Sequence, residues 1–439
     1  MKNLNILNAI ILGVSGIAIV AAVIMFSTYR SGGPTSSTGR VEMWGTIPAA
    51  TLTPIFQELA LEDEDYASLT YVEKSSDTFE DDLLQGLAEG SGPDLVLIDE
   101  KMVAANQRRM QTIPYESFPL RTFQDLFLDE GSLLLSRDGV LGFPFLVDPL
   151  VMYYNKDTLS NSGFAKPPET WTEVLAVTPT LTQKDSSFNI TRSTIALGSF
   201  ENIRNAKDIF WTLTMQAGNP VFERYIDSQT QQERYRSILN QNLNFTLNPA
   251  YAATNFFTQF SNPTKTVYTW NRSLPESQTM FVAGDLAFYI GYASELPTIQ
   301  RINPNLNFDV ALLPQSQTST RKVTYGSMKT LVIPKSSKNV PGAISMIAKL
   351  TSLSSQQKFS SVLGIPSVRR DLLSTYDSTS PFQSVFNRSA VIAQGMLEPD
   401  ARQTDGIVRE LVDTVISGQY EISAAVNRAH EKLNALTNE

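Results

Sequence analysis

The sequence predicts an α/β fold made of two lobes that exchange segments of chain. Between residues 41 and 98, apolar strands alternate with amphipathic helices, which is typical of a parallel α/β sheet. Helical patterns dominate from residue 202 to 285. Strand-like runs then return at 287–290, 308–312 and 331–333. An α/β pattern that is interrupted and then resumed indicates that the chain leaves one lobe, builds a second and comes back.

The elements of the first lobe follow from their composition. A strand is predicted over 41–44 and ends at Gly45. Thr53-Pro54 is a helix start, because a capping hydroxyl precedes a proline at the first helical position. A second helix presents an apolar face built on Phe79 and stops at Gly90, and residues 94–98 form a buried strand.

The later elements are predicted in the same way. The run 150–154 is rich in strand-forming residues, and Thr170 or Thr172 is expected to cap the helix that follows Pro168. Another helix begins near Pro341, and two amphipathic helices close the chain.

The N-terminal residues predict a membrane anchor. An apolar run covers residues 6–26, and about 20 residues at a rise of roughly 1.5 Å span a bilayer core. A cleavable signal peptide has a shorter apolar core and a small-x-small site, neither of which is present here. We therefore expect an uncleaved signal-anchor helix over 1–30 and a flexible linker over 31–40. A long signal peptide cut near Ser31 is the alternative, and both readings export the rest of the chain.

Composition disfavours several classes of function. The chain has no cysteine and one histidine, His430, so thiolate sites, imidazole metal sites and Ser-His-Asp catalysis are disfavoured. The net charge is −9 and no basic cluster stands out, which argues against nucleic acid. Aromatic residues make up 10% of the chain and charged residues only 18%, a balance that suits binding of a neutral polar molecule. We expect no cofactor and no metal.

Seven stretches, in the right order from Val41 onward, resemble the extracellular solute-binding proteins of ABC importers, in the family that contains the maltodextrin- and sugar-binding members. The most diagnostic is Gly142-Phe-Pro-Phe145 followed by Met152-Tyr-Tyr-Asn-Lys-Asp157. The others are Gly90–Leu97, Gly163–Glu173, Phe281–Gly291, Phe308–Pro314, Ile333–Asn339 and Gly364–Arg369.

The resemblance implies a two-lobed periplasmic-binding-protein-like fold with three interlobe crossings and a ligand cleft between the lobes. Mapped onto this chain, the crossings fall near 146–150, 291–293 and 353–359. Lobe 1 is then expected over 41–147 plus 292–355, and lobe 2 over 148–291 plus 356–439. Ligand that touches both lobes shifts the population toward a closed form, which a membrane permease would recognise.

Candidate ligand-binding residues lie just after strands or beside the crossings, since ligands of open α/β sheets bind at strand carboxyl ends. Each has a structural alternative, such as core packing for Trp44 or a hinge hydrogen bond for Asp148. The residues are Trp44, Asp99, Phe145, Asp148, Trp270, Asn271, Tyr292, Tyr325 and Arg369. Sugar-binding members often place a stacking aromatic before the penultimate helix. The stretch 399–407 has none, so charged contacts from Arg402 or Asp405 come into consideration.

The function predicted on this basis is capture of a small polar solute, a carbohydrate by preference, for delivery to the transmembrane subunits of an ABC permease. The protein would be a monomer, attached to the cell membrane by a single span, with its binding domain on the extracytoplasmic side. It would not be an enzyme, because no carboxylate pair is set apart by its surroundings as a glycosidase requires. A sensory or adhesive ectodomain that presents ligand to a signalling partner is the alternative.

Overall fold

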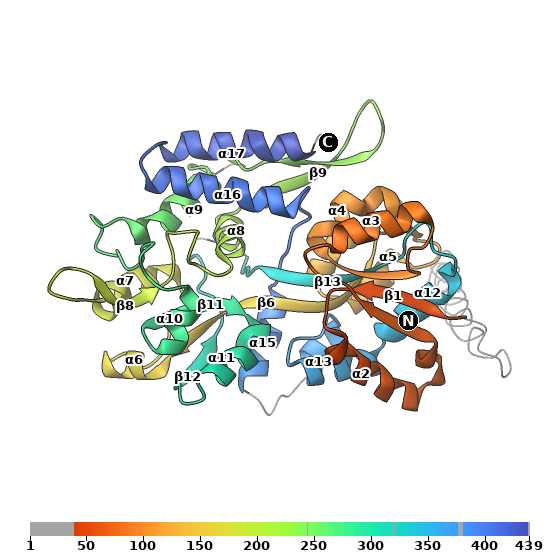
Figure 1. Ribbon diagram of the computed structural model, residues 1–439. Helices are drawn as coiled ribbons and strands as arrows, with labels where there is room; N and C mark the ends of the chain where they lie inside the picture. The colour runs from red at the N-terminus through yellow and green to blue at the C-terminus, as the bar shows by residue number, and fades with distance from the viewer. Residues whose placement is uncertain (1–38, 244, 318, 320, 376–380, 438–439) are drawn as a thin grey trace, which may run out of the picture.

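One sheet of nine strands runs through both lobes of the protein (Figure 1). Its order is β2-β1-β3-β13-β6-β11-β8-β7, with β12 paired to β6 outside this path. The long strand β6 (Phe143–Asn155) is shared, because its first part pairs with β13 (Gly326–Val332) and its second part with β11 (Leu286–Tyr292) and β12 (Phe308–Ala311). The other strands are β1 (Val41–Gly45), β2 (Leu69–Glu73), β3 (Leu95–Asp99), β4 (Ile113–Pro114), β5 (Gly139–Val140), β7 (Gln183–Lys184), β8 (Ile190–Ile195), β9 (Phe222–Ile226) and β10 (Glu233–Ser237).

The computed structural model describes residues 39–437 apart from 244, 318, 320 and 376–380. The expected anchor, 1–30, and nearly all of the expected linker, 31–40, lie outside the described residues. Within the described part of the chain, none of the helices has the length and apolar character needed to cross a membrane.

Lobe 1 is the half whose core contains the parallel strands β1, β2 and β3, as the alternating pattern predicted. Gly90 ends α3 in the left-handed conformation, with φ 67°, so the helix stops where the sequence indicated. The expected helix start at Thr53-Pro54 is wrong, because α2 begins at Ala49 and Pro54 lies inside it. The helices of this lobe are α2 (Ala49–Glu62), α3 (Phe79–Glu89), α4 (Val103–Asn106), α5 (Leu120–Leu126), α12 (Val340–Leu350), α13 (Leu353–Leu363) and α14 (Arg370–Thr375).

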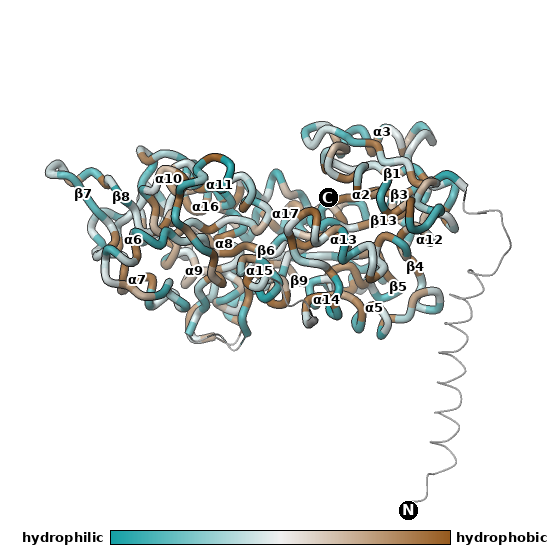
Figure 2. The backbone as a smooth tube through the Cα atoms, turned by 90° about the horizontal axis from the view of Figure 1, so that it is seen from below, coloured by the Kyte–Doolittle hydropathy of each residue, from teal (hydrophilic) through white to brown (hydrophobic). Residues whose placement is uncertain are grey.

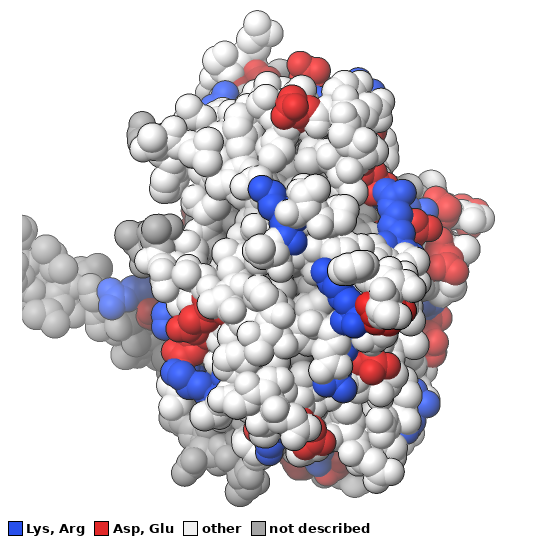
Figure 3. Space-filling view, turned by 90° about the vertical axis from the view of Figure 1, so that its left-hand side faces the viewer, with Lys and Arg blue, Asp and Glu red and all other residues white. Residues whose placement is uncertain are grey.

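Lobe 2 surrounds α8 (Ala206–Gln216), every residue of which is buried. Hydrophobic colouring follows the central strands and helices of both lobes, while hydrophilic residues dominate the outer loops (Figure 2). On the outer end of lobe 2, charged side chains of both signs are scattered among uncharged ones (Figure 3). The other helices of this lobe are α6 (Lys156–Asn161), α7 (Trp171–Leu181), α9 (Pro249–Thr258), α10 (Ser277–Ala283), α11 (Leu296–Ile302), α16 (Ala401–Ile416) and α17 (Ile422–Thr437).

The first two crossings can be located from the residues that each core contains. Val147 belongs to the core of lobe 1 and Leu150 to that of lobe 2, so β6 crosses inside the expected range 146–150. The second crossing differs from the expected 291–293. After β11 the chain forms α11 and β12, and β12 extends the lobe 2 sheet by pairing with β6. The chain returns to lobe 1 only between Tyr325 and Met328, so the described residues between 292 and 325 pack with lobe 2 rather than lobe 1.

The third crossing also lies later than the expected 353–359. Phe359 on α13 packs edge-on against Phe145, with ring centroids 4.8 Å apart, which keeps this helix in lobe 1. The crossing involves α15 (Pro381–Val391), whose Phe386 belongs to the core of lobe 2 and whose Ala390 belongs to that of lobe 1. The segment that follows residue 356 is therefore still part of lobe 1.

A capping box fixes the start of α7. Thr170 Oγ1 accepts a hydrogen bond from Glu173 N at 3.3 Å, and Glu173 Oε2 accepts one from Thr170 N at 3.4 Å. Of the two threonines that the sequence offered as caps, Thr170 is the one used.

We expect Thr170→Ala to lower the free energy of unfolding by about 1 kcal/mol, because a helix N-terminus loses its cap. Urea denaturation measures this change. The matched control is Thr172→Ala, two residues along on the exposed side of the same helix. Equal stability losses in the two variants would contradict the assignment of the cap.

Candidate functional site

Charged side chains from both lobes lie together, buried or half-buried, near the points where the chain crosses. Lobe 1 provides Glu100 and Lys101, which follow β3 directly. Lobe 2 provides Lys207 and Asp208 from the first turn of α8, and Glu398 from the segment just before α16. Tyr292 ends β11, and Tyr325 precedes β13. We call these seven residues the interlobe cluster: Glu100, Lys101, Lys207, Asp208, Tyr292, Tyr325 and Glu398.

Short polar contacts join the members of the interlobe cluster. The Tyr292 hydroxyl donates to Asp208 Oδ2 at 2.6 Å. Lys207 Nζ pairs with Glu398 Oε2 at 2.7 Å, and Glu398 is fully buried. The Tyr325 hydroxyl faces Glu100 Oε1 at 3.4 Å, while Glu100 Oε2 accepts from the backbone N–H of Met328 at 2.8 Å. The cluster therefore ties β3, α8 and two crossing segments to one another.

Lys101 carries a positive charge from lobe 1 toward carboxylates of lobe 2. Burial acts to lower its pKa, but the neighbouring carboxylates, Asp208 foremost and Glu398 among them, raise it more strongly. None of the ion pairs found within 4 Å among the described residues includes Lys101. The ammonium group therefore attracts the lobe 2 carboxylates over more than 4 Å rather than in direct contact.

Burial also changes the protonation of the acidic groups around the crossings. It raises the pKa of Glu100 to about 8 and that of Glu398 above its ordinary value, the latter against the opposing effect of Lys207. It raises the pKa of Glu130 well above the usual range as well, with the Glu100 charge adding to the effect. At neutral pH, Glu100 is therefore mainly protonated and uncharged.

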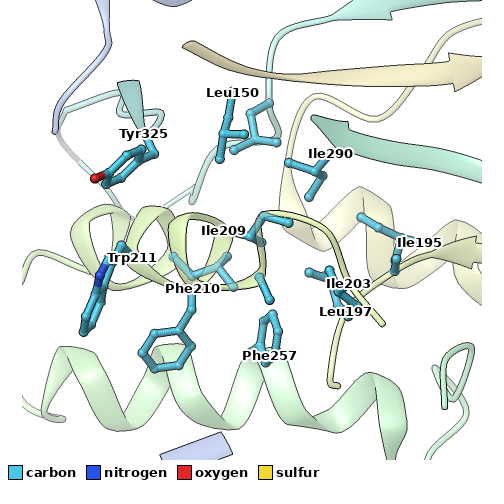
Figure 4. Close-up of a cluster of buried hydrophobic side chains, with 14 of the residues drawn as sticks. Leu150, Ile195, Leu197, Ile203, Ile209, Phe210, Trp211, Phe257, Ile290 and Tyr325 are labelled. Atoms are coloured by element: carbon cyan, nitrogen blue, oxygen red, sulfur yellow. The ribbon is translucent and has the colours of Figure 1, made fainter. Parts of the chain in front are cut away.

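Several buried polar atoms of this region have no hydrogen-bond partner within the described part of the chain. They include Asp208 Oδ1, Glu398 Oε1 and the indole Nε1 of Trp211. Trp211 lies on α8, and Tyr325 lies beside the same helix (Figure 4). The backbone N–H of Tyr325 donates to Thr212 Oγ1 on this helix at 3.1 Å. Because buried polar groups are nearly always satisfied, these atoms mark places for groups that the protein itself does not supply.

Four of the nine residues expected from the sequence lie in or beside the interlobe cluster. Tyr292 and Tyr325 are members. Asp99 adjoins Glu100 and pairs with Lys329 at 2.8 Å. Asp148 accepts a hydrogen bond from Ser294 N at 3.0 Å, and burial raises its pKa to about 7. Asp148 thus makes the hinge hydrogen bond that was its structural alternative.

Three expected aromatic residues are packed inside single lobes. Phe145 and Trp270 are fully buried in the cores of lobe 1 and lobe 2. Trp44 is 8% exposed, its Nε1 donates to Glu42 Oε1 at 2.7 Å, and Lys74 Nζ lies 3.8 Å from the centroid of its ring. None of these rings is brought to the interlobe cluster, because each fills a core position or is covered by a side chain of its own lobe.

The remaining two expected residues are held in local structure. Asn271 Oδ1 accepts from the backbone N–H of Ser273 at 2.9 Å, as in an Asx turn. Arg369 pairs with Asp371 at 2.6 Å, which is the ion pair considered as its alternative.

Of the two late charged residues, Arg402 reaches across the lobes, where its Nη2 donates to the carbonyl of Asp77 at 3.0 Å. Asp405 instead pairs with Arg409 within α16, at 3.6 Å.

Sequence reasoning missed the charged members of the interlobe cluster. One signal was available, since Glu100 and Lys101 follow Asp99 at the end of the same strand. Lys207 and Glu398 are 191 positions apart in the sequence, and nothing local shows that they pair. Among the described residues, no group of three or more histidine, cysteine, aspartate or glutamate side chains is arranged to hold a metal ion.

We expect Phe145→Ala to lower the free energy of unfolding by about 3–5 kcal/mol, because it leaves a cavity against Phe359 in the core of lobe 1. Chemical denaturation of Phe145→Ala and Phe145→Leu would measure the loss, and the leucine variant should lose less. An alanine variant as stable as the natural chain would contradict a core role.

Stability should depend on pH through Glu100. Its pKa is about 8 in the folded protein against an ordinary value of 4.5, so folding favours the protonated form. The stabilisation is complete below pH 4.5 and is lost as pH rises toward 8. Relative to the natural chain, Glu100→Gln should therefore raise the melting temperature at pH 8 by at least about 4 °C and change it less at pH 5.

Thermal unfolding at both pH values tests this expectation. Glu80→Gln, which changes an exposed glutamate on α3, is the control. An effect of Glu100→Gln that is the same at the two pH values would exclude the proposed titration.

Comparison with known proteins gives a family and a fold. The family model described as "Bacterial extracellular solute-binding protein" matches residues 49–357. A comparison with curated proteins gives no match. Three solved structures resemble the chain closely in fold but at low sequence identity.

The first is a cyclo/maltodextrin-binding protein complexed with maltotetraose, with TM-score 0.71, 17% identity and coverage of 92% of this chain and 98% of that one. The second is the sugar-binding protein MalE from Xanthomonas citri, with TM-score 0.70, 17% identity, and coverage of 91% and 97%. The third is an ABC transporter solute-binding protein from Thermotoga lettingae bound with α-D-tagatose, with TM-score 0.65, 18% identity, and coverage of 91% and 100%.

These findings confirm the resemblance drawn from the seven sequence stretches and the expectation that the protein binds a solute rather than transforms it. The family match covers well over half of the chain, and the fold agrees with it. The chain belongs to the bacterial extracellular solute-binding proteins.

Proposed function

We propose that this protein captures a small neutral polyhydroxylated solute, a carbohydrate by preference, between its two lobes and delivers it to an ABC permease. The apolar segment 6–26 would hold it at the outer face of the cell membrane. The family supports solute binding, and the neighbours of similar fold include proteins solved with maltotetraose and with α-D-tagatose.

The observation that carries the proposal is the set of unsatisfied polar atoms in the interlobe cluster. Asp208 Oδ1 and Glu398 Oε1 can only accept hydrogen bonds, whereas the Lys101 ammonium opposite them can only donate. A sugar hydroxyl both donates and accepts, so neighbouring hydroxyls satisfy the two kinds of group together. A ligand held in this way touches both lobes, as hinge closure requires.

The charges of the cluster favour a neutral ligand. Lys207 balances Glu398 in a direct pair, and Lys101 faces Asp208. The carboxyl of Glu100 is mainly protonated at neutral pH. An anionic or cationic solute would leave an unpaired charge in this buried region, and burying such a charge is strongly unfavourable.

A thermal-shift screen of the full-length protein in detergent against sugars, polyols, amino acids and oligopeptides tests the proposal. A ligand present at about 100 times its Kd should stabilise the fold by about 2.7 kcal/mol. Stabilisation by amino acids or peptides alone would overturn the carbohydrate class.

For a sugar that binds, we expect Asp208→Asn to raise Kd by about tenfold or more, because an acceptor for a ligand hydroxyl is lost at a buried position. The substitution keeps one carbonyl oxygen for the Tyr292 hydroxyl but removes the charge that attracts Lys101, so the empty protein should also melt at a somewhat lower temperature. Calorimetric titration gives Kd. Asp285→Asn, at an exposed position of lobe 2, is the matched control, and equal affinities in the two variants would remove Asp208 from the site.

A further inference from the structure

A β-hairpin of lobe 2 reaches over to lobe 1. Strands β9 and β10 pair antiparallel from Phe222 opposite Ser237 to Ile226 opposite Glu233. Figure 1 shows this hairpin extending along α17 and past the C-terminal end of that helix, away from the body of lobe 2. Its base is fixed to lobe 2, because the backbone N–H of Ser237 donates to Asn434 Oδ1 on α17 at 2.8 Å.

The side of the hairpin that faces lobe 1 makes charge-assisted hydrogen bonds to it. The Arg224 guanidinium donates from Nη1 to the carbonyl of Leu135 and from Nη2 to the carbonyl of Leu133. Glu233 holds Arg224 in place through an ion pair of 3.2 Å, and Glu233 Oε2 also accepts from the backbone N–H of Arg137 at 3.3 Å. Two paired side chains of lobe 2 thus bind three backbone groups of lobe 1.

One aromatic ring adds an apolar contact. Tyr235 belongs to the hairpin by sequence, yet it packs against the core of lobe 1. The guanidinium carbon of Arg224 lies 5.5 Å from the centroid of the same ring, so the ring also supports the arginine.

This contact has the character of an interface that can separate. It is mainly polar, and a hollow of about 410 Å³ that opens to the solvent lies beside it, lined by Ser136, Arg137, Arg224, Tyr225, Ile226 and Glu233. Water can therefore reach the edge of this contact. The hydrogen bonds of Arg224 and Glu233 can therefore be exchanged for water without opening a sealed core.

We propose that the β9–β10 hairpin is a clasp that stabilises the closed arrangement of the lobes. The clasp sets the ratio of open to closed molecules from outside the interlobe cluster, so its residues change closure without touching the solute. This inference concerns the lobes alone and holds whatever the protein binds.

The absence of cysteine allows the clasp to be tested by paired spin labels. Ser76→Cys, in an exposed loop of lobe 1, and Ser423→Cys, on the exposed side of α17, give one label on each lobe of the full-length protein in detergent. Electron–electron double resonance then gives the distribution of interlobe distances with no solute added. We expect Arg224→Ala to raise the proportion of a longer-distance population about tenfold relative to the closed one, which corresponds to about 1.4 kcal/mol.

Arg236→Ala is the matched control. It removes an arginine from the same hairpin, but the ion pair of Arg236 with Glu223, at 2.5 Å, lies within the hairpin and does not reach lobe 1. The control should leave the distance distribution unchanged.

Glu233→Ala is the second test variant if Arg224→Ala does not fold, because it removes the support of Arg224 and the contact with Arg137. A distribution identical to that of the natural chain in a folded clasp variant would overturn the inference. If Arg236→Ala shifted the interlobe distance distribution as much as Arg224→Ala, the inference would also be overturned. The effect would then come from a less stable hairpin and not from lost contacts with lobe 1.

Discussion

Strand β6 is the element on which the two-lobed structure depends. Its thirteen residues run through both halves of the molecule, and hydrogen bonds on each side of the crossing commit one end to β13 and the other to β11 and β12. Within this strand, the core of lobe 1 ends at Val147 and that of lobe 2 begins at Leu150. Every group placed near this point, including Asp148 and the interlobe cluster, is buried by contributions from both lobes. The raised pKa values of the acidic groups follow from this burial.

The charged residues near the crossings and the contacts at the edges of the lobes have different physical roles. In the interlobe cluster, desolvation is strong and partners are incomplete, so the free energy of the closed form depends on what satisfies the remaining atoms. At the edges, Arg224 and Arg402 bind backbone carbonyls of the opposite lobe. Such contacts need no solute. The balance between these two groups of interactions determines how far closure depends on ligand.

Much of the fold could be predicted from the sequence, because its signals are local. The sequence correctly predicted that Gly90 ends a helix and that a threonine caps the helix that begins at Trp171. It also predicted the apolar parallel strands of lobe 1. The two later crossings were placed too early, since the pairing of β12 with β6 and the packing of Phe359 on Phe145 are decided by distant parts of the chain.

The site was predicted only in part. Tyr292 and Tyr325 stand next to strand ends, whereas Lys207 and Glu398 pair only because two segments 191 positions apart in the sequence come together.

Helix α15 restricts how the lobes can move. Phe386 is embedded in one core and Ala390, one turn later, in the other. This helical turn is packed into lobe 2 at one end and into lobe 1 at the other. It would have to unfold or leave one core if the two lobes separated widely at this point. The axis of any rotation must therefore pass close to this turn, as it also must pass close to β6. Because α15 packs against β6, the two connections lie side by side, and we expect the lobes to rotate about an axis that passes close to both.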